Sequence, residues 1–218
     1  MVVAIDGPAG VGKSSLAARV ADDFGFLNLN SGAFYRAVAV KVLEGGVDTS
    51  DADAVVAAAA SARLDLVEGR LFLDGEDVEG RLRTDAVDHW SSALSAIVPL
   101  RHVVNAHLRR ASRGINLVAE GRDMTTVVFP DAEVKVYLDA DPAVRARRRF
   151  DQGTSGLTLG EIERTMAERD LRDRSKAEGA LMKAPDAVSI DTSALTLDEV
   201  YATVSRLIRN HLQYRSQE

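Results

Sequence analysis

The segment GPAGVGKSS, from Gly7 to Ser15, contains the residue types that bind a triphosphate. It matches the pattern G-x-x-x-x-G-K-[ST], with Gly7, Gly12, Lys13 and Ser14 at the fixed positions. Glycines allow backbone N–H groups to curl around phosphate oxygens, and a helix that follows adds the positive end of its dipole. The lysine reaches the β- and γ-phosphates, and the serine hydroxyl is a ligand for Mg²⁺. We therefore expect ATP as phosphoryl donor, Mg²⁺ as cofactor and Ser14 as the metal ligand.

The whole loop and one arginine further along the chain are expected to bind ATP. These residues are Gly7, Pro8, Ala9, Gly10, Val11, Gly12, Lys13, Ser14, Ser15 and Arg149. Arg149 ends the basic run 145–149, which is interpreted equally well as a solvated helix surface. If the run is functional, Arg145 and Arg149, one helical turn apart, flank a lid and reach the ATP phosphates. Asp6, just before the loop, either braces it or acts on Mg²⁺.

Short apolar runs that alternate with helical segments must position this loop. The runs are VVAID (2–6), FLNLN (26–30), INLVAEG (115–121), EVKVYLDA (133–140) and AVSID (187–191). Helices are predicted at about 13–24 and 32–44, near 84–96, after Pro99, and between and after the last strands. Five short strands separated by helices indicate an α/β protein with a parallel sheet covered on both faces, here a P-loop NTPase fold.

One stretch interrupts this alternation. EGRLFLDGEDVEGRLRT, at 68–84, places apolar residues on both sides of an Asp-Gly pair, which is typical of β-hairpins, although the flanking chain is Ala- and Leu-rich like a helix. We expect a small antiparallel ribbon there. Further along, Gly, Ser and Thr dominate DQGTSGLTLG at 151–160, so this segment is predicted to be a mobile loop that forms a short lid.

Composition limits the class of protein. The 218 residues are 46% hydrophobic and 28% charged, which is ordinary for a globular chain, and the lack of cysteine excludes disulfides and thiolate metal sites. The start of the chain has no secretory-signal pattern, and no apolar run approaches the roughly 18 residues of a membrane helix. The net charge of −6 disfavours a nucleic-acid partner. We expect a cytoplasmic monomer that binds neither membranes nor nucleic acid.

A phosphate-binding loop does not define the reaction, so other motifs must. The N-K-x-D motif of GTPases is absent, and D-x-x-G occurs only at Asp77–Gly80, inside the predicted ribbon. ATPase motors end a strand in Asp-Glu, whereas the run 115–121 has a lone Glu120. Arginines are instead spread along the chain, as two facing phosphorylated substrates would require. They are Arg36, Arg101, Arg122 and those in the clusters 145–149 and 169–176.

Three further segments, behind the start IDGPAGVGKSS, resemble bacterial-type cytidylate kinase, a family of P-loop nucleoside monophosphate kinases. They are NSGAFYRAVA, EGRDMTTVVFPDAEVKVYLDA and ERDLRDRSK, and the resemblance runs from Val3 to about Thr192. It implies ATP-dependent phosphorylation of CMP, and of dCMP, in pyrimidine nucleotide metabolism. It also implies that the ribbon at 63–80 is an insertion over the acceptor site. The single kinase domain then comprises a core (about 1–60, 100–150 and 177–218), an insertion in the monophosphate-binding region (about 61–99) and a lid region (about 151–176).

The resemblance also assigns the acceptor site residue by residue. It assigns Ser31, Arg36 and Arg122 to phosphate, Ser92, Arg101 and Asp123 to the cytosine edge, and Arg169 and Asp173 to the sugar and phosphate. Asp123 would accept from the exocyclic amine of cytosine while Arg101 donates to the ring acceptors. Uracil would present an acceptor to Asp123 and should bind worse. The residues expected to be catalytic are Lys13, Arg122 and Arg169.

Three positions depart from the family pattern and leave the choice among CMP, dCMP and UMP open. Asn30 stands for a usual Asp, Thr125 for a usual Gly near the base-reading loop, and Lys176 for a usual Arg. Lysine keeps the charge but gives up the bidentate grip of arginine on phosphate. The alternatives are a UMP/CMP or other small-acceptor P-loop kinase, and a non-catalytic P-loop nucleotide-binding regulator that places a basic face on a polyanion.

Overall fold

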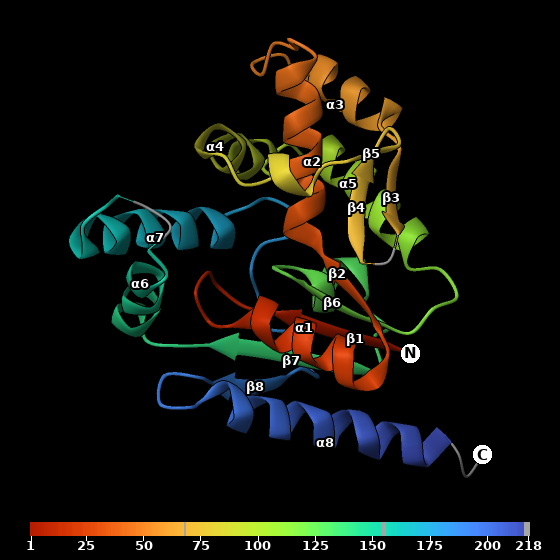
Figure 1. Cartoon of the computed structure of the whole chain (residues 1–218), viewed down its shortest axis with the longest axis vertical. Coiled ribbons are helices and arrows are strands. Elements are labelled where there is room, and N and C mark those ends of the chain that lie inside the picture. The colour runs from red at the N-terminus through yellow and green to blue at the C-terminus, as the bar shows by residue number, and fades with distance from the viewer. Residues whose placement is uncertain (68, 154–155, 216–218) are drawn as a thin grey trace. The chain divides into compact units, whose positions relative to one another are not determined.

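The computed structural model of the chain describes residues 1–67, 69–153 and 156–215 (Figure 1). The chain divides into two compact units, which we call the first unit (Met1–Asn28 with Asn116–Glu218) and the second unit (Leu29–Ile115). The predicted insertion at 61–99 belongs to the second unit. Positions 154 and 155 of the predicted lid loop lie outside the described residues.

The predicted five-stranded parallel sheet is confirmed. Its strands are β1 (Val2–Asp6), β2 (Leu27–Asn30), β6 (Leu117–Gly121), β7 (Val134–Asp139) and β8 (Val188–Asp191). Their order is β2-β6-β1-β7-β8, and β1 pairs in parallel with β6 and β7, as β7 does with β8. Each strand lies within one of the five apolar runs. Short, continuously apolar runs between helices form buried parallel strands, because both faces of such a sheet are covered.

The register of the sheet brings the ends of three strands side by side. Asp6 of β1 pairs with Gly121 of β6 and with Tyr137 of β7. In parallel α/β sheets, ligands bind outside the carboxyl ends of such strands. The sheet therefore carries the phosphate-binding loop after β1 beside the polar residues at the end of β6.

The core of the first unit lies between the sheet and two helices, α1 (Lys13–Phe24) and α8 (Leu197–Arg215), which also pack against each other (Figure 1). Its buried members are apolar residues of the strands and of the inward helix faces. They include Val3, Ile5, Leu16, Val20, Val118, Val136, Leu138, Val204 and Ile208. Within the described residues, no helix is both long and apolar enough to cross a membrane.

Two further helices of the first unit begin at clear sequence signals. In α6 (Pro142–Asp151) the proline stands in the first turn, and the Asp141 side chain caps the helix by accepting from the N–H of Ala143. In α7 (Leu159–Arg174) Thr158 and Glu161 form a capping box. A π-helical turn, η2 (Met124–Val128), follows β6 and was not predicted from the sequence.

The second unit contains the predicted ribbon as a three-stranded antiparallel sheet, β3 (Leu64–Val67), β4 (Arg70–Leu73) and β5 (Glu76–Asp77). The expected Asp-Gly turn joins β4 to β5, and both of its residues have positive φ, 54° for Asp74 and 91° for Gly75, as a type I′ turn requires. The strand β3 lies before the stretch 68–84 and adds a partner to the expected pair. The helical elements of this unit are α2 (Ser31–Glu44), α3 (Ala52–Ser61), η1 (Glu79–Arg81), α4 (Asp85–Leu94) and α5 (Val98–Ala111).

Candidate active site

The predicted ATP loop, residues 7–15, lies between β1 and α1. The φ angles of Gly7, Gly10 and Gly12 are 154°, 79° and 94°, which are conformations that glycine adopts most readily. A Cβ on Gly7 would lie 2.2 Å from the carbonyl oxygen of Leu138, so the neighbouring strand β7 also requires a glycine. Gly12 is the N-cap residue of α1. The loop thus leads directly into a helix N-terminus, an arrangement that binds phosphate.

Lys13 is buried inside the loop. Its Nζ donates to the carbonyl oxygens of Gly7 at 2.8 Å and Pro8 at 2.7 Å. Burial lowers the pKa of Lys13, and the positive charge of Arg122 lowers it further, to about 7, although nearby carboxylates act in the opposite direction. The surrounding negative charge is therefore too small to keep the Lys13 ammonium fully protonated at neutral pH. The phosphates of a bound nucleotide would supply the additional negative charge.

Ser14, the predicted Mg²⁺ ligand, donates through Oγ to Oε1 of Glu120 at 2.5 Å. Glu120 is buried near the end of β6, in register with Ile5 of β1. Mg²⁺ is commonly bound by one or two protein oxygens together with substrate phosphates. Within the described part of the chain, no group of three or more His, Cys, Asp or Glu residues could hold a metal ion. The Ser14–Glu120 pair fits an ion that shares its remaining ligands with a nucleotide.

Asp6 holds the turn that follows β6. Its Oδ1 accepts from the N–H of Met124 at 2.8 Å, and its Oδ2 accepts from the N–H and Oγ1 of Thr125 at 2.7 and 2.6 Å. Burial raises the pKa of Asp6, and these hydrogen bonds offset only part of that rise. The side chain of Thr125, which departs from the family pattern, thus donates to Asp6. The contacts of Asp6 favour a bracing role over a role at Mg²⁺, but the segment that it braces is the turn after β6.

Arg122 and Asp173, both predicted to bind CMP, form an ion pair with Arg122 Nε 2.8 Å from Asp173 Oδ2. Lys176 Nζ lies 2.8 Å from the other oxygen, Oδ1. Burial alone would raise the pKa of Asp173, but Arg122 and Lys176 outweigh it and hold the pKa at about 2. Asp173 therefore stays ionised and ties α7 to Arg122, which directly follows β6.

The three residues predicted to be catalytic are Lys13, Arg122 and Arg169. The charges of both arginines lower the pKa of Lys13, as groups close to it would. Arg169 lies one turn before Asp173 on α7. Three cations around a phosphate-binding loop repel one another, and a bound polyphosphate would relieve that repulsion.

Of the remaining predicted CMP residues, Asp123 is buried in the first unit directly after Arg122. The other four, Ser31, Arg36, Ser92 and Arg101, belong to the second unit. Ser31 is buried at the start of α2, and Arg36 Nε lies 2.8 Å from Asp88 Oδ1 of α4. The side chain of Asn30 caps α2 by accepting from the N–H of Ala33 at 3.1 Å. An aspartate would accept the same bond, so the Asn30 departure is compatible with this helix start.

Arg101 is buried in α5, with only 2% of its surface exposed. Its Nη1 donates to the carbonyl oxygen of Ser95 at 3.1 Å, and its guanidinium lies 5.7 Å from the centre of the Tyr35 ring. Ser92 is half-buried on α4, and its carbonyl oxygen accepts from Ser95 Oγ at 2.7 Å. A buried arginine with fixed partners is suited to recognition rather than to a solvated helix surface.

The basic run 145–149 divides into different environments. Arg149 is exposed and donates to Gln152 Oε1 at 3.3 Å, so its assignment to ATP stays a prediction. Arg145 is buried, and its Nη1 donates to the carbonyl oxygen of Ala9 in the ATP loop at 3.2 Å. The contact between this helix and the loop is therefore made by Arg145.

Glu120 was not among the predicted site residues. In the sequence it argues only against an ATPase motor. A usable signal was its position as a polar residue near the carboxyl end of an otherwise apolar strand. Only the sheet order, which places β6 beside β1, brings Glu120 to Ser14.

A phosphate-binding loop on a parallel sheet, with a buried lysine and surrounding arginines, defines a P-loop kinase. The chain belongs to the cytidylate kinase family, whose family model matches residues 3–210. The cytidylate kinase of Solibacter usitatus is 40% identical over 217 residues, covering 97% of this chain and 94% of that protein. The cytidylate kinase of Cupriavidus necator is 42% identical over 210 residues, covering 93% of each. The resemblance identified from the sequence is thus confirmed.

Solved structures share the fold at much lower identity. Shikimate kinase from Bacteroides thetaiotaomicron is 10% identical with a TM-score of 0.50, covering 96% of this chain and 98% of that one. An uncharacterized protein from Eubacterium ventriosum is 12% identical with a TM-score of 0.54, with the same coverage. These likenesses concern the fold alone, which agrees with the prediction.

Proposed function

We propose that this chain transfers the γ-phosphoryl group of ATP to a phosphate oxygen of CMP, and of dCMP, forming the nucleoside diphosphate. Membership of the cytidylate kinase family supports this acceptor. The observation that supports the chemistry is the buried Lys13 inside the phosphate-binding loop, whose pKa is lowered by burial and by the charges of Arg122 and Arg169. These cations are suited to the negative charge of a transferring phosphoryl group.

The acceptor needs no dedicated general base. A phosphate monoester has its second pKa near 6, so its attacking oxygen is already anionic near neutral pH. The task of the chain is therefore to align two anions and neutralise their charge. The loop N–H groups and Lys13 hold the β- and γ-phosphates of ATP, while Arg122 and Arg169 bind the oxygens of the group in transfer.

Ser14 and Glu120 would hold Mg²⁺ together with ATP, and the ion would supply neutralisation of phosphate charge. Asp173 keeps Arg122 in a fixed direction before the substrates arrive, because the carboxylate stays ionised and hydrogen-bonded. Preorganised charges of this kind cost little reorganisation during the reaction.

The acceptor base is proposed to be read by Asp123 and Arg101, with Ser92, and the acceptor phosphate to be bound by Arg36 and Ser31. The support for these assignments is the match to family motifs together with the burial of Asp123 and Arg101, at 3% and 2% exposure. A cytosine amine would donate to Asp123, whereas a uracil carbonyl would face it with a second acceptor. We therefore propose CMP and dCMP as better acceptors than UMP.

The chain is further proposed to act as a cytoplasmic monomer on small molecules, without nucleic acid. Its net charge of −6 supports the last point. Size-exclusion chromatography with light scattering would report the mass of the particle, and a dimer mass would contradict the monomer.

The acceptor proposal is tested by coupled ADP release with ATP and Mg²⁺, comparing CMP, dCMP, UMP and AMP. We expect strong turnover with CMP and dCMP and little with UMP. Equal rates with CMP and UMP would indicate a UMP/CMP kinase with an altered base site. The absence of any acceptor-dependent ADP release would favour the non-catalytic P-loop nucleotide-binding regulator.

A further inference from the structure

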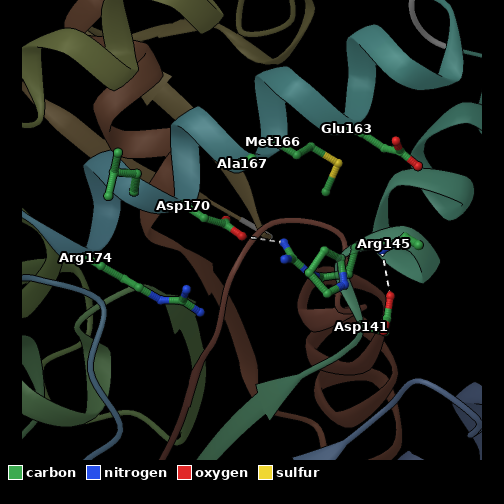
Figure 2. A pocket seen from close by; sticks show the side chains of 10 residues that line it. Asp141, Arg145, Glu163, Met166, Ala167, Asp170 and Arg174 are labelled. Atoms are coloured by element: carbon green, nitrogen blue, oxygen red, sulfur yellow. Dashed lines mark hydrogen bonds and ion pairs between the residues drawn. The ribbon is translucent and has the colours of Figure 1, made fainter.

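A buried ion pair connects the ATP loop with α7. Arg145 Nη1 of α6 lies 2.7 Å from Asp170 Oδ2 of α7, and the two side chains are only 5% and 7% exposed. Figure 2 shows the arginine side chain reaching from its helix toward Asp170. The same guanidinium donates through Nη1 to the carbonyl oxygen of Ala9 at 3.2 Å and through Nε to that of Ala140 at 3.1 Å. One side chain therefore contacts the loop, the residue after β7, and α7.

Close packing reinforces this junction at Gly10. A Cβ on Gly10 would lie 3.0 Å from Cε of Met166 on α7 and 3.1 Å from Cβ of Arg145. The Met166 side chain points from α7 into the space beside Arg145 in Figure 2. The loop, α6 and α7 are therefore closely packed around Gly10. A shift of α7 would displace the loop at this residue.

Asp170 has no other evident task. Its Oδ1 is buried and has no hydrogen-bond partner within the described residues, so Arg145 is the partner that compensates its charge. A buried ion pair is weak support for stability, because desolvation offsets the attraction, but it does define a geometry. Asp170 directly follows Arg169 on α7 and lies three residues before Asp173, the partner of Arg122.

We propose that Arg145 and Asp170 form a positioning pair, which fixes α7 against the ATP loop and thereby sets the place of Arg169. Neither residue is assigned a contact with the reacting atoms. The pair acts through the backbone of the loop on one side and through α7 on the other. The kinetic consequence rests on the proposed kinase function, whereas the mechanical coupling of loop and helix does not.

A pocket beside the pair makes a conservative test feasible. Its volume is about 590 Å³, and side chains of α6 and α7 form most of its lining (Figure 2). Asp170 is part of the lining, so the additional methylene of glutamate has space to be accommodated there. D170E can therefore restore the ion pair, whereas D170N keeps the shape and removes the charge.

We expect D170N to lower kcat with CMP by about 10- to 100-fold, the effect of a small misplacement of a reacting group, and to change the KM for ATP less than about threefold. If D170N lowers kcat by about a hundredfold, the kcat of D170E should be at least about tenfold higher than that of D170N. The matched control is D186N, which removes the exposed carboxylate of the Lys135–Asp186 pair in the first unit and should leave kcat within about twofold. Wild-type kcat in D170N would overturn the proposal, as would an equal loss in D170N and D170E.

Hydrogen exchange measures the coupling without any substrate. D170N should speed amide exchange both in the loop at 9–12 and in α7 at 166–173, while α8 stays unchanged. Unchanged exchange in the loop would overturn the mechanical part of the proposal, even if the wild-type protein proves not to phosphorylate CMP.

A second variant covers the case in which D170N fails to fold. R145M/D170M replaces the pair by apolar side chains, a change that buried ion pairs often tolerate. The double variant should unfold near the wild-type temperature and still show the kcat loss. A folded double variant with wild-type kcat would overturn the proposal.

Discussion

The two units use their charges differently. In the first unit, Lys13 and Asp173 are buried, and fixed partners on several elements hold them. In the second unit, pairs such as Lys41–Asp74 and Arg81–Glu44 are partly or largely exposed. Buried charges have little solvent screening, so their positions affect phosphate chemistry strongly, whereas exposed pairs contribute little. We therefore expect changes in the first unit to alter kcat, and those in the second unit to alter the KM for the acceptor.

The largest effect is expected from K13M. Removal of the ammonium that we propose binds the β- and γ-phosphates should lower turnover by about 10³-fold or more. Thermal unfolding at pH 7 should be unchanged or occur at a higher temperature, because the variant no longer buries an amine whose pKa is lowered to about 7. The exposed Lys183 offers a matched control, and K183M should keep wild-type turnover. Substantial CDP formation by K13M would remove Lys13 from the proposed mechanism.

D173N should have the next largest effect. It releases Arg122 from its ion pair, so kcat should fall by about 10- to 100-fold. The folded-state pKa of Asp173, about 2, lies below its unfolded value, so its stabilisation is present above about pH 4 and is lost as the pH falls toward 2. This contribution is about 2 kcal/mol. In urea unfolding at pH 7 and pH 2, the wild-type protein should lose about 2 kcal/mol more than D173N does; equal losses would contradict the assignment.

The pH dependence of ATP binding sharpens the comparison further. Lys13 has a pKa of about 7 without ligand, and ATP should bind when the amine is protonated. The Kd for ATP should therefore rise with pH, approaching about tenfold per unit above pH 7. Calorimetric titrations between pH 6 and 9 measure this trend. A Kd that stays constant over this range would show that Lys13 does not couple protonation to ATP binding.

The smallest of these effects is expected for R36Q in the second unit. Arg36 pairs with the half-exposed Asp88, so its loss should change the free energy of unfolding by less than about 1 kcal/mol. If Arg36 binds the acceptor phosphate, the KM for CMP should rise about tenfold, which is the low end of the cost of losing one hydrogen bond to a charged group. Kinetics with CMP and ATP varied separately would distinguish this from a rise in the KM for ATP, which would contradict the assignment.

The sheet and the ATP loop were predictable because their signals are local. Apolar runs separated by helices predicted all five strands, and the spacing of Gly7, Gly12 and Lys13 predicted the loop. The Asp-Gly pair likewise predicted the turn at residues 74 and 75. The Asp-Gly signal alone did not identify β3, because its apolar residues precede the hairpin; only the range 63–80, implied by the resemblance, includes this strand, which pairs with β4.

Contacts between distant segments could not be predicted in the same way. The interpretation of Thr125 placed its side chain by the base-reading loop, whereas its hydroxyl donates to Asp6, which lies far away in the sequence. The motif around Arg169 drew attention to Asp173 but not to Asp170, whose partner on α6 is set by helix packing. Contacts such as Thr125–Asp6 and Arg145–Asp170 depend on how whole helices and strands pack against one another. The spacing of residues along the sequence does not predict this packing.

The central claim is phosphoryl transfer to CMP rather than to water. Phosphorus-31 NMR of the wild-type protein with ATP, Mg²⁺ and CMP follows donor, acceptor and products in one sample. The account predicts that ADP and CDP grow in equal amounts while inorganic phosphate stays at background. Growth of inorganic phosphate without CDP would contradict it.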